Sequence, residues 1–541
     1  MLNVLLPILA FLSLWIFSGN TRREPKWRAA FIQAMILWGT YTVLLIEVLS
    51  FFKAINRTTL SLGWGLLLLS FAIWLALWIK RRAVLRLPLV YRGLTPSVTF
   101  LDVLLTLIVI IPLLIGFIAP PNSQEAMSFG MTRVAIWEQN QSLAHFATAN
   151  EGLNSAPPGM GIQLLNFYVL SGSDRWSNFV AWVAFLGSIE AVMAIAGLFG
   201  ASPKGTRLAA IFGATLPIAL ALASGSLDDL PSCLWVMSFI LMAFYYKNDK
   251  NYTFNLILAI LAFSLAFITK PVSLIFLVPF VVYLLILRLR QVKIWQTLAG
   301  ILIAALIFGT FSAGFLYRNF QTYGTGYELQ AYYDDLNGLI DWRTIISNTS
   351  RNMVLHANIP IPGANAWIMR NLENLHNALN LDINDPRTTS GGSFSVAPFN
   401  TSEMTSGNPI HALLIILIIF FIFVIFFRKS HRELILYAGL LLVSVLFYII
   451  LLRWRPDGSR WHLTFFFMFA PLAGFLLEYL NGKKKTLGTV VALVLIVSSL
   501  PWLFSVRERP IIPIKDITYP HSIFSASRQD LYFATAPQLG P

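Results

Sequence analysis

LLTLIVIIPLLIGFIAPPNSQEAMSFGMTRVAIWEQN, residues 104–140, passes from a strongly apolar run to a polar segment within a few residues. The apolar run, 97–118, is long enough to cross a bilayer as a helix. After Pro120-Pro121, residues 122–134 mix apolar and polar side chains, which is typical of a short helix on a membrane surface with Glu125 near its start. A second stretch of this kind, 159–170, follows Pro157-Pro158. An ordinary surface loop is the alternative interpretation of 120–175.

Composition indicates a polytopic membrane protein. Of the 541 residues, 57% are hydrophobic and 12% are charged, and the apolar residues fall into long blocks. The first block, 2–18, has no basic region before it and no clear cleavage site after it, so we expect a retained first span. The net charge of +14 does not indicate nucleic acid, because most Lys and Arg lie at the ends of apolar blocks. The single cysteine, Cys233, excludes an internal disulfide and a cysteine-based metal cluster.

We therefore predict an all-α fold, a bundle of about fourteen transmembrane helices. The spans are expected near 2–18, 28–52, 60–79, 97–118, 176–199, 206–224, 231–246, 252–268, 271–288, 295–315, 408–427, 433–452, 463–480 and 486–505. No internal repeat is visible, which argues against transporters built from two repeats.

The distribution of basic residues predicts the orientation of the bundle. Lys and Arg gather in alternate connections, which should therefore be cytoplasmic. These residues are Arg22, Arg23, Lys26, Arg28, Lys80, Arg81, Arg82, Arg86, Arg92, Lys204, Arg207, Lys247, Lys250, Arg288, Arg290, Lys293, Arg428, Lys429, Arg432, Lys483, Lys484 and Lys485. The opposite, extracytoplasmic side then receives the long loops 120–175 and 316–407 and the tail 506–541.

This orientation places acidic side chains on the extracytoplasmic side. Glu125, Asp228 and Asp229 follow different spans but share that face, so they can meet over one cavity. Two carboxylates there could act as a general base and as an electrostatic or metal partner. The alternative for Asp228 or Asp229 is that it only caps the helix that begins near Pro231.

Basic residues in short connections on the same side break the positive-inside tendency. Lys270, Arg318, Arg455 and Arg460 are candidates to hold a phosphate or pyrophosphate at the membrane surface. The alternative is that they are snorkelling anchors for lipid head groups. His411 and His462 have no partner at the spacing of a zinc site. Glu47 and Glu190 lie inside apolar runs, so each must face the bundle interior or a polar partner.

Several of these motifs together resemble those of the bacterial membrane glycosyltransferases of the GT-C fold, related to protein O-mannosyltransferases and to lipid A aminoarabinose transferase. The resemblance spans about 120 to 465 and leaves out the three N-terminal spans. It rests on NSQEAMSFGMTRVAIWEQN (122–140, with Arg133), SGSDR (171–175), Asp228-Asp229, Thr269-Lys270-Pro271, RNFQ (318–321), Glu403 with Gly407-Asn408 and His411, and RWRP (453–456) running to Ser459-Arg460 and His462.

The resemblance implies an inverting transfer of a sugar from a polyprenyl phosphate to an extracytoplasmic acceptor. The family's catalytic Asp falls on Glu125, and the aromatic and His residues that usually follow are here Phe129 and Gly130. Asp229 matches the second acid, and Lys270 matches a lysine near the lipid phosphate. The resemblance further makes Asp228, Arg133, Arg318, Glu403, Arg455, Arg460 and His462 candidate substrate-binding residues. It leaves open a divalent metal ion, with Glu125 and Asp229 as its ligands if one is bound.

The resemblance also implies domains and a location. Residues 1–96 lie outside it, 97–315 and 408–505 form the transmembrane part, and the plasma (inner) membrane is the expected location. The expected partners are the lipid-linked sugar donor, membrane lipid and the acceptor, with no nucleic acid. The alternatives are a non-catalytic binder of lipid-linked glycans, a flippase or transporter, and an inactive relative in which Glu125 no longer does the usual chemistry.

Overall fold

The structure, a computed structural model, describes residues 2–21, 26–81, 84–87, 99–248, 252–324, 335–361, 363–426, 432–483 and 486–534. Part of the charge pattern that predicts the orientation lies outside these residues. The positions concerned are Arg22, Arg23, Arg82, Arg92, Lys250, Arg428, Lys429, Lys484 and Lys485.

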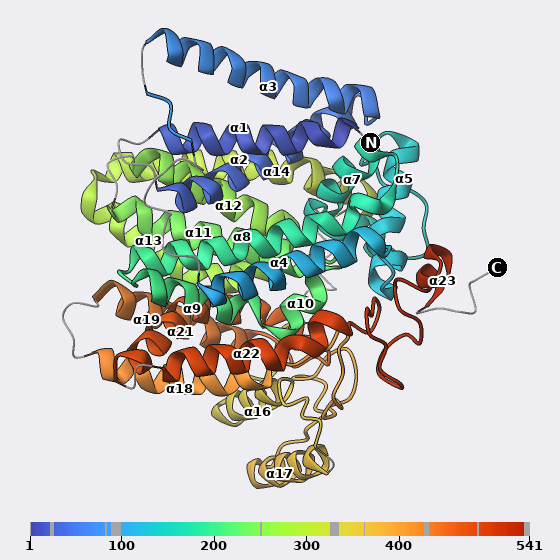
Figure 1. The fold of residues 1–541 in the computed structure, drawn as a ribbon, viewed down its shortest axis with the longest axis vertical. Coiled ribbons are helices and arrows are strands. Elements are labelled where there is room, and N and C mark those ends of the chain that lie inside the picture. Colours follow the sequence, from blue (N-terminus) through green and yellow to red (C-terminus); the bar gives the residue numbers. More distant parts are fainter. Residues whose placement is uncertain are drawn as a thin grey trace.

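The described chain is mainly helical (Figure 1). Its elements are η1 (Leu2–Val4), α1 (Leu5–Asn20), α2 (Trp27–Phe51), α3 (Arg57–Lys80), α4 (Phe100–Ile118), η4 (Ala126–Met131), α5 (Thr132–Asn140), α6 (Gly152–Ser155), α7 (Gly159–Ser171), η5 (Asp174–Trp176), α8 (Ser177–Leu198), α9 (Pro203–Ala214), α10 (Pro217–Ala223), α11 (Asp229–Asn248), α12 (Tyr252–Thr269), α13 (Ser273–Gln291), α14 (Ile294–Tyr323), α16 (Trp342–Val354), α17 (Ala364–Leu379), α18 (Pro409–Phe426), α19 (Arg432–Leu451), α20 (Gly458–Trp461), α21 (Leu463–Lys483), α22 (Leu487–Phe504) and α23 (Arg528–Phe533).

The all-α, multi-pass membrane architecture is confirmed. Within the residues described, eleven helices are long and apolar enough to cross a membrane, or up to twelve if the bent pair α9 and α10 is one span. The bend is 70° and follows from Pro217, which has no backbone N–H with which to continue the helix. Two more predicted spans are helices with shorter apolar parts, Thr253–Thr269 and Pro409–Phe423. The count of fourteen therefore stays a prediction.

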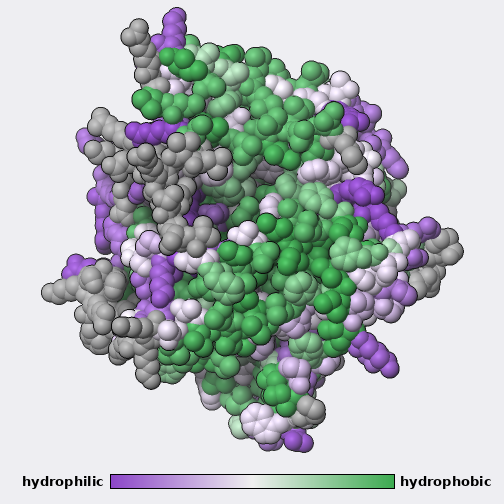
Figure 2. All heavy atoms as spheres, in the orientation of Figure 1, coloured by the Kyte–Doolittle hydropathy of each residue, from purple (hydrophilic) through white to green (hydrophobic). Residues whose placement is uncertain are grey.

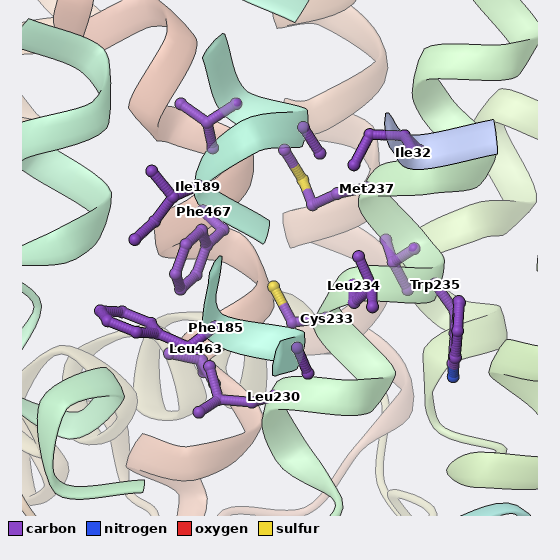
Figure 3. Packing of buried hydrophobic residues seen from close by; sticks show 14 of the residues in the cluster. Ile32, Phe185, Ile189, Leu230, Cys233, Leu234, Trp235, Met237, Leu463 and Phe467 are labelled. Atoms are coloured by element: carbon purple, nitrogen blue, oxygen red, sulfur yellow. The ribbon is translucent and has the colours of Figure 1, made fainter. Parts of the chain in front are cut away.

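The centre of the bundle is α11, whose membrane-spanning stretch is buried over its whole length. It packs against α8, α12, α13 and α21. In Figure 3, Phe185 of α8, Cys233 of α11 and Phe467 of α21 lie together in this contact. Because α11 begins at Asp229, this fully buried helix fixes the position of the Asp228-Asp229 pair at its start.

The periphery of the bundle is apolar. Leu62, Leu66, Leu69 and Ile73 of α3 are all more than half exposed, and they face away from α1, on which α3 packs. Figure 2 shows green across the middle of the helices and purple gathered toward their two ends. This banding is what a lipid-facing surface with polar rims produces. We call the end with η4, α5, α23 and the long connections the loop-bearing end (right in Figure 1).

The segment 120–175 differs from the surface loop or pair of surface helices that we expected. A helix does form around Glu125, but it is π-helical over Ala126–Met131 before it continues as α5. The second stretch, α7, does not lie on a membrane surface, because nearly all of its residues are buried against α2, α3, α5 and α8. The helix α7 carries apolar side chains on all its faces. A helix of this kind is stable when other parts of the protein bury all of those faces. Its buried Asn166 accepts a 2.9 Å hydrogen bond from Nε1 of Trp64 on α3.

The predicted boundary at 315 is also wrong. The thirty residues of α14 run on to Tyr323, so Arg318 lies in its last turns and not in a loop. The N-terminal spans are not a separate unit either. Although residues 1–96 lie outside the resemblance, α2 packs directly on α7, α8, α11 and α12.

Candidate functional site

A cavity of about 620 Å³ opens at the loop-bearing end of the bundle. Its wall is formed by the start of the π-helical turn, the segment around α6, the start of α11, the turn between α12 and α13, and the connection between α19 and α21, together with Asp335 and Met404. The lining residues are Gln124, Glu125, Ser128, Phe129, Asn150, Gly152, Ser155, Ala156, Pro157, Asp228, Thr269, Lys270, Pro271, Val272, Asp335, Met404, Arg455, Asp457, Arg460 and Trp461. The cavity therefore unites residues from four of the motifs on which the resemblance rests.

Local sequence explains why these side chains reach the cavity. Lys270 comes at the end of α12, where Pro271 prevents the helix from continuing. Asp228 and Asp229 precede Pro231 at the first turn of α11, which suits a helix start. Pro456 separates α19 from the single turn α20, which carries Arg460.

Arg460 is the centre of the site. Its side chain is only 3% exposed, and it joins two carboxylates that come from distant parts of the chain. Nη1 lies 2.5 Å from Oε2 of Glu125, and Nε donates to Oδ2 of Asp229 at 2.8 Å. A buried guanidinium is stable only when it is paired in this way. The pairing thus fixes the segment around Glu125 to the start of α11.

Lys270 completes the network. Its Nζ donates to Oδ1 of Asp229 at 2.6 Å and to Oδ1 of Asp228 at 3.0 Å. It also lies 5.9 Å from the ring centroid of Trp461, and Arg455 lies 4.8 Å from the same ring. The Trp461 ring therefore contacts both cations at the cavity wall.

Arg455 is held by acids that the sequence analysis missed. Its Nη1 lies 2.6 Å from Oδ1 of Asp335, and its Nε lies 3.0 Å from Oδ1 of Asp457. Asp457 lies two positions after Arg455 in the same motif, so the sequence could have indicated that the two residues form an ion pair. Asp335 lies in the long connection between α14 and α16, where no local pattern predicts a partner for it.

Acids outnumber bases in and behind the cavity wall. Three cations, Lys270, Arg455 and Arg460, are surrounded by five carboxylates, which belong to Glu125, Asp228, Asp229, Asp335 and Asp457. Asp229 is only 2% exposed and is fully engaged by Arg460 and Lys270, whereas Asp228 and Glu125 are 31% and 37% exposed toward the cavity. The two more exposed carboxylates are the ones that a ligand in the cavity can reach.

Protonation differs among these groups. The pKa of Asp228 is raised, mainly because the surrounding protein deprives its carboxylate of water, and the neighbouring charge of Asp229 adds to this; Lys270 opposes it. Burial alone would lower the pKa of Lys270, but Asp228 and Asp229 together raise it. Asp228 thus takes up a proton more readily than an ordinary Asp, and Lys270 keeps its charge.

Arg318 and Arg133 lie outside this cluster. Arg318 forms a bidentate ion pair with Glu47 of α2, with both N–O distances at 2.9 Å, which gives Glu47 the polar partner it requires. Arg133 donates to the backbone carbonyls of Ala156 and Pro157 at 3.0 and 3.1 Å, so it shapes the cavity wall without lining it. Its guanidinium also stacks 4.7 Å from the ring centroid of Trp137.

Glu403 and His462 are also occupied elsewhere. Glu403 is buried in an ion pair with Arg509 of the C-terminal segment, which also donates to Asn122. This contact ties the C-terminal segment to the start of the segment 120–140. His462 lies 3.0 Å from His356 through their ring nitrogens, and burial lowers the pKa of His462 to about 3.

The acidic side chains of the site bear on whether it can hold a metal ion. Among the residues described, no group of three or more His, Cys, Asp or Glu side chains is arranged to hold a metal ion. Glu125 and Asp229, the expected ligands, are separated by the Arg460 guanidinium that bonds to both. A cation between them would first have to displace that guanidinium, so this arrangement does not fit a metal there.

No family model matches the chain, and no curated protein and no solved structure is similar to it.

Proposed function

We propose that this protein is an integral-membrane, inverting glycosyltransferase that moves a sugar from a polyprenyl-phosphate donor to an extracytoplasmic acceptor. The observation that carries this proposal is the network of Glu125, Arg460, Asp229 and Lys270, which borders a 620 Å³ cavity at the loop-bearing end of a membrane bundle. Carboxylates that can take a proton stand there within reach of cations that can hold a phosphate.

In this proposal the phosphate leaving group binds at Lys270 and Arg455. Both residues line the cavity and lie against the Trp461 ring, which makes them our candidates for the phosphate contacts. Arg supplies a planar fork and Lys a point charge, and both stabilise the negative charge that develops as the bond to the sugar breaks.

The proton is taken by a cavity carboxylate, with Glu125 as our first choice and Asp228 as its rival. The acceptor oxygen forms a bond to C1 of the sugar on the face opposite the phosphate. The bond between C1 and the phosphate oxygen breaks, its electron pair leaves with the phosphate, and the acceptor proton passes to the carboxylate. Asp229 positions Arg460 and Lys270, because its own oxygens are already engaged by both.

The experiment measures donor binding and sugar transfer by purified protein in lipid nanodiscs. Arg455→Ala and Lys270→Met should each weaken binding of a prenyl-phosphate sugar through loss of a charge-assisted contact worth about 1.5–3 kcal/mol, roughly ten- to a hundredfold in affinity. The matched control is Arg387→Ala, which removes an exposed arginine paired with Asp385. Unchanged donor affinity in both folded variants would refute the phosphate site. Donor binding by the wild type without transfer to any acceptor would favour the non-catalytic alternative.

A further inference from the structure

The helix α16 (Trp342–Val354) is amphipathic in the reverse of the usual sense. Its buried face is polar and consists of Thr344, Ser347, Asn348, Arg351 and Asn352. Its outward face carries Trp342, Ile346 and Met353, which are 65%, 41% and 51% exposed. These three positions are spaced by four and seven residues and so form one stripe on a helix. In water, the polar face of a helix faces outward.

The polar face is satisfied by the protein. Ser347 bonds to the ring of His376 on α17 at 2.8 Å. Arg351, fully buried, donates to the Ile383 carbonyl at 2.7 Å and to Thr389 at 2.6 Å. Asn348 donates to the carbonyls of Ile449 and Leu452 at 3.1 and 3.3 Å. These bonds fix which face of α16 points inward and leave the apolar stripe outside.

The same bonds place α16 beside the end of a membrane span. Ile449 belongs to the last turn of α19, a span that ends at Leu451. Asn337 donates to the carbonyls of Ile450 and Leu452 at 2.8 Å, and Leu336 forms an antiparallel bridge with Leu452. The connection before α16 is thus joined to α19 at the level where that helix leaves the bilayer.

Exposed apolar side chains are present on the end of the span, on this connection and on α16. Leu446 and Leu451 of α19 are 45% and 38% exposed, as expected for side chains that face lipid. Leu336, Ile340 and Trp342 follow at 40%, 58% and 65%. The lipid-facing surface of the span therefore continues onto α16.

We propose that α16 lies in the outer part of the leaflet at the loop-bearing end, with Trp342, Ile346 and Met353 among the lipid acyl chains. Moving the aliphatic side chains from water into an apolar phase is favourable, and an interfacial Trp suits this depth. The proposal does not depend on the proposed function. It makes the connection 335–361 a membrane-anchored element, and Asp335, the partner of Arg455, stands at its start.

The test is the depth of a nitroxide label in the full-length protein, reconstituted into palmitoyl-oleoyl phosphatidylcholine vesicles. The label is attached at Ile346→Cys in a Cys233→Ser background. The reference positions are Leu446→Cys on the lipid face of α19 and Asn374→Cys on the exposed face of α17. All three variants must elute as folded protein before labelling.

At Ile346→Cys we expect collisions with oxygen to dominate over collisions with a water-soluble nickel chelate, as at Leu446→Cys and in contrast to Asn374→Cys. Collision with the nickel chelate as frequent as at Asn374→Cys would overturn the proposal, because the stripe would then face water. Exclusion of both reagents, with dipolar broadening between labels on two chains, would overturn it in favour of a protein interface. A label at Trp342→Cys gives an independent reading at the same stripe, and the same three outcomes apply.

Discussion

Arg460 forms ion pairs with the carboxylates of Glu125 and Asp229, which lie more than a hundred residues apart in sequence. These ion pairs replace the hydrogen bonds that water would otherwise donate to the two carboxylates. A single guanidinium can do this because its donors point in fixed directions from one plane. As a consequence, the carboxylates differ in how far they are accessible from the cavity. Asp229 is enclosed by Arg460 and Lys270, while Glu125 and Asp228 keep oxygens that face the cavity.

Glu125→Gln should abolish sugar transfer while leaving donor binding nearly unchanged, because it keeps the shape of the side chain but removes the base. A positioned base typically contributes about 10²–10⁴-fold to the rate. The measurement is single-turnover transfer with saturating donor. Wild-type turnover in Glu125→Gln, together with an inactive Asp228→Asn, would move the base to Asp228.

The pH dependence of transfer separates the same two residues. If Asp228 is the base, its raised pKa means that a larger fraction is protonated and inactive as the pH falls, so the rate declines on the acid side from a higher pH than for an ordinary Asp. Asp228→Asn would remove that acid limb along with the activity. An acid limb that persists unchanged in an active Asp228→Asn would assign it to another group.

Much of this site could be predicted at the level of single residues, but not which residue pairs with which. Glu125, Asp228, Asp229, Lys270, Arg455 and Arg460 were identified because charged residues stood on one side of the apolar runs. Asp335 was not identified, because its contact with Arg455 depends on how a long connection folds back. Glu47 lacked a role for a similar reason, since its partner Arg318 is 271 positions away.

At the level of helices, the Glu47–Arg318 pair joins α2 to α14 directly beside Gly314. A Cβ on Gly314 would stand 2.5 Å from Oε2 of Glu47 and 3.1 Å from Nη1 of Arg318. Both charged side chains are largely buried, at 19% and 16% exposed. The contact therefore depends on the glycine as well as on the two charges.

Arg318→Gln should destabilise the protein by about 3 kcal/mol, because it leaves the Glu47 carboxylate buried without its partner. The double variant Glu47→Gln, Arg318→Gln should recover much of that loss, since no charge is then stranded. Unfolding in mixed micelles at increasing denaturant fraction gives the comparison. Glu433→Gln is the control, because its pair with Lys247 is about one-third exposed and should matter by less than about 1 kcal/mol.

Donor binding by the Arg318→Gln variant is a second test of the role of Arg318. Because Arg318 is engaged by Glu47 and lies apart from the cavity cluster, its loss should leave donor binding unchanged. A loss comparable to that of Arg455→Ala would return Arg318 to the substrate site.

Helices were predictable where the apolar pattern was long, and less so where packing decides. The positions of α4, α8 and α11 follow from apolar blocks of span length. The short helix α7 was assigned to the membrane surface, because a sequence of thirteen mostly apolar residues does not reveal that α2, α3, α5, α8 and α12 all pack against it. The extension of α14 past its apolar block could not be read from hydropathy, because its last turns are polar.

For the whole molecule, the alternation of charge predicts that the loop-bearing end faces away from the cytoplasm. Single cysteines at Asn374 and His521, in a Cys233→Ser background, should react with an impermeant maleimide on intact cells. Lys204→Cys at the other end should react only after lysis. Cys233 is buried, so its removal should change little. Labelling at Lys204→Cys but not at the other two sites in intact cells would reverse the orientation.

The surplus of carboxylates in the cavity wall couples the uptake of an anionic ligand to the uptake of protons. A phosphate brought near Asp228 would raise its already raised pKa further, so binding in the pH range where Asp228 titrates would draw hydrogen ions from the buffer. Titration calorimetry in two buffers of different ionisation enthalpy should then give two different heats for the same donor. The difference should shrink in Asp228→Asn, and the wild type should bind more weakly as the solution becomes alkaline. At a membrane whose outer surface is acidic, a larger fraction of this protein would therefore have the anionic donor bound.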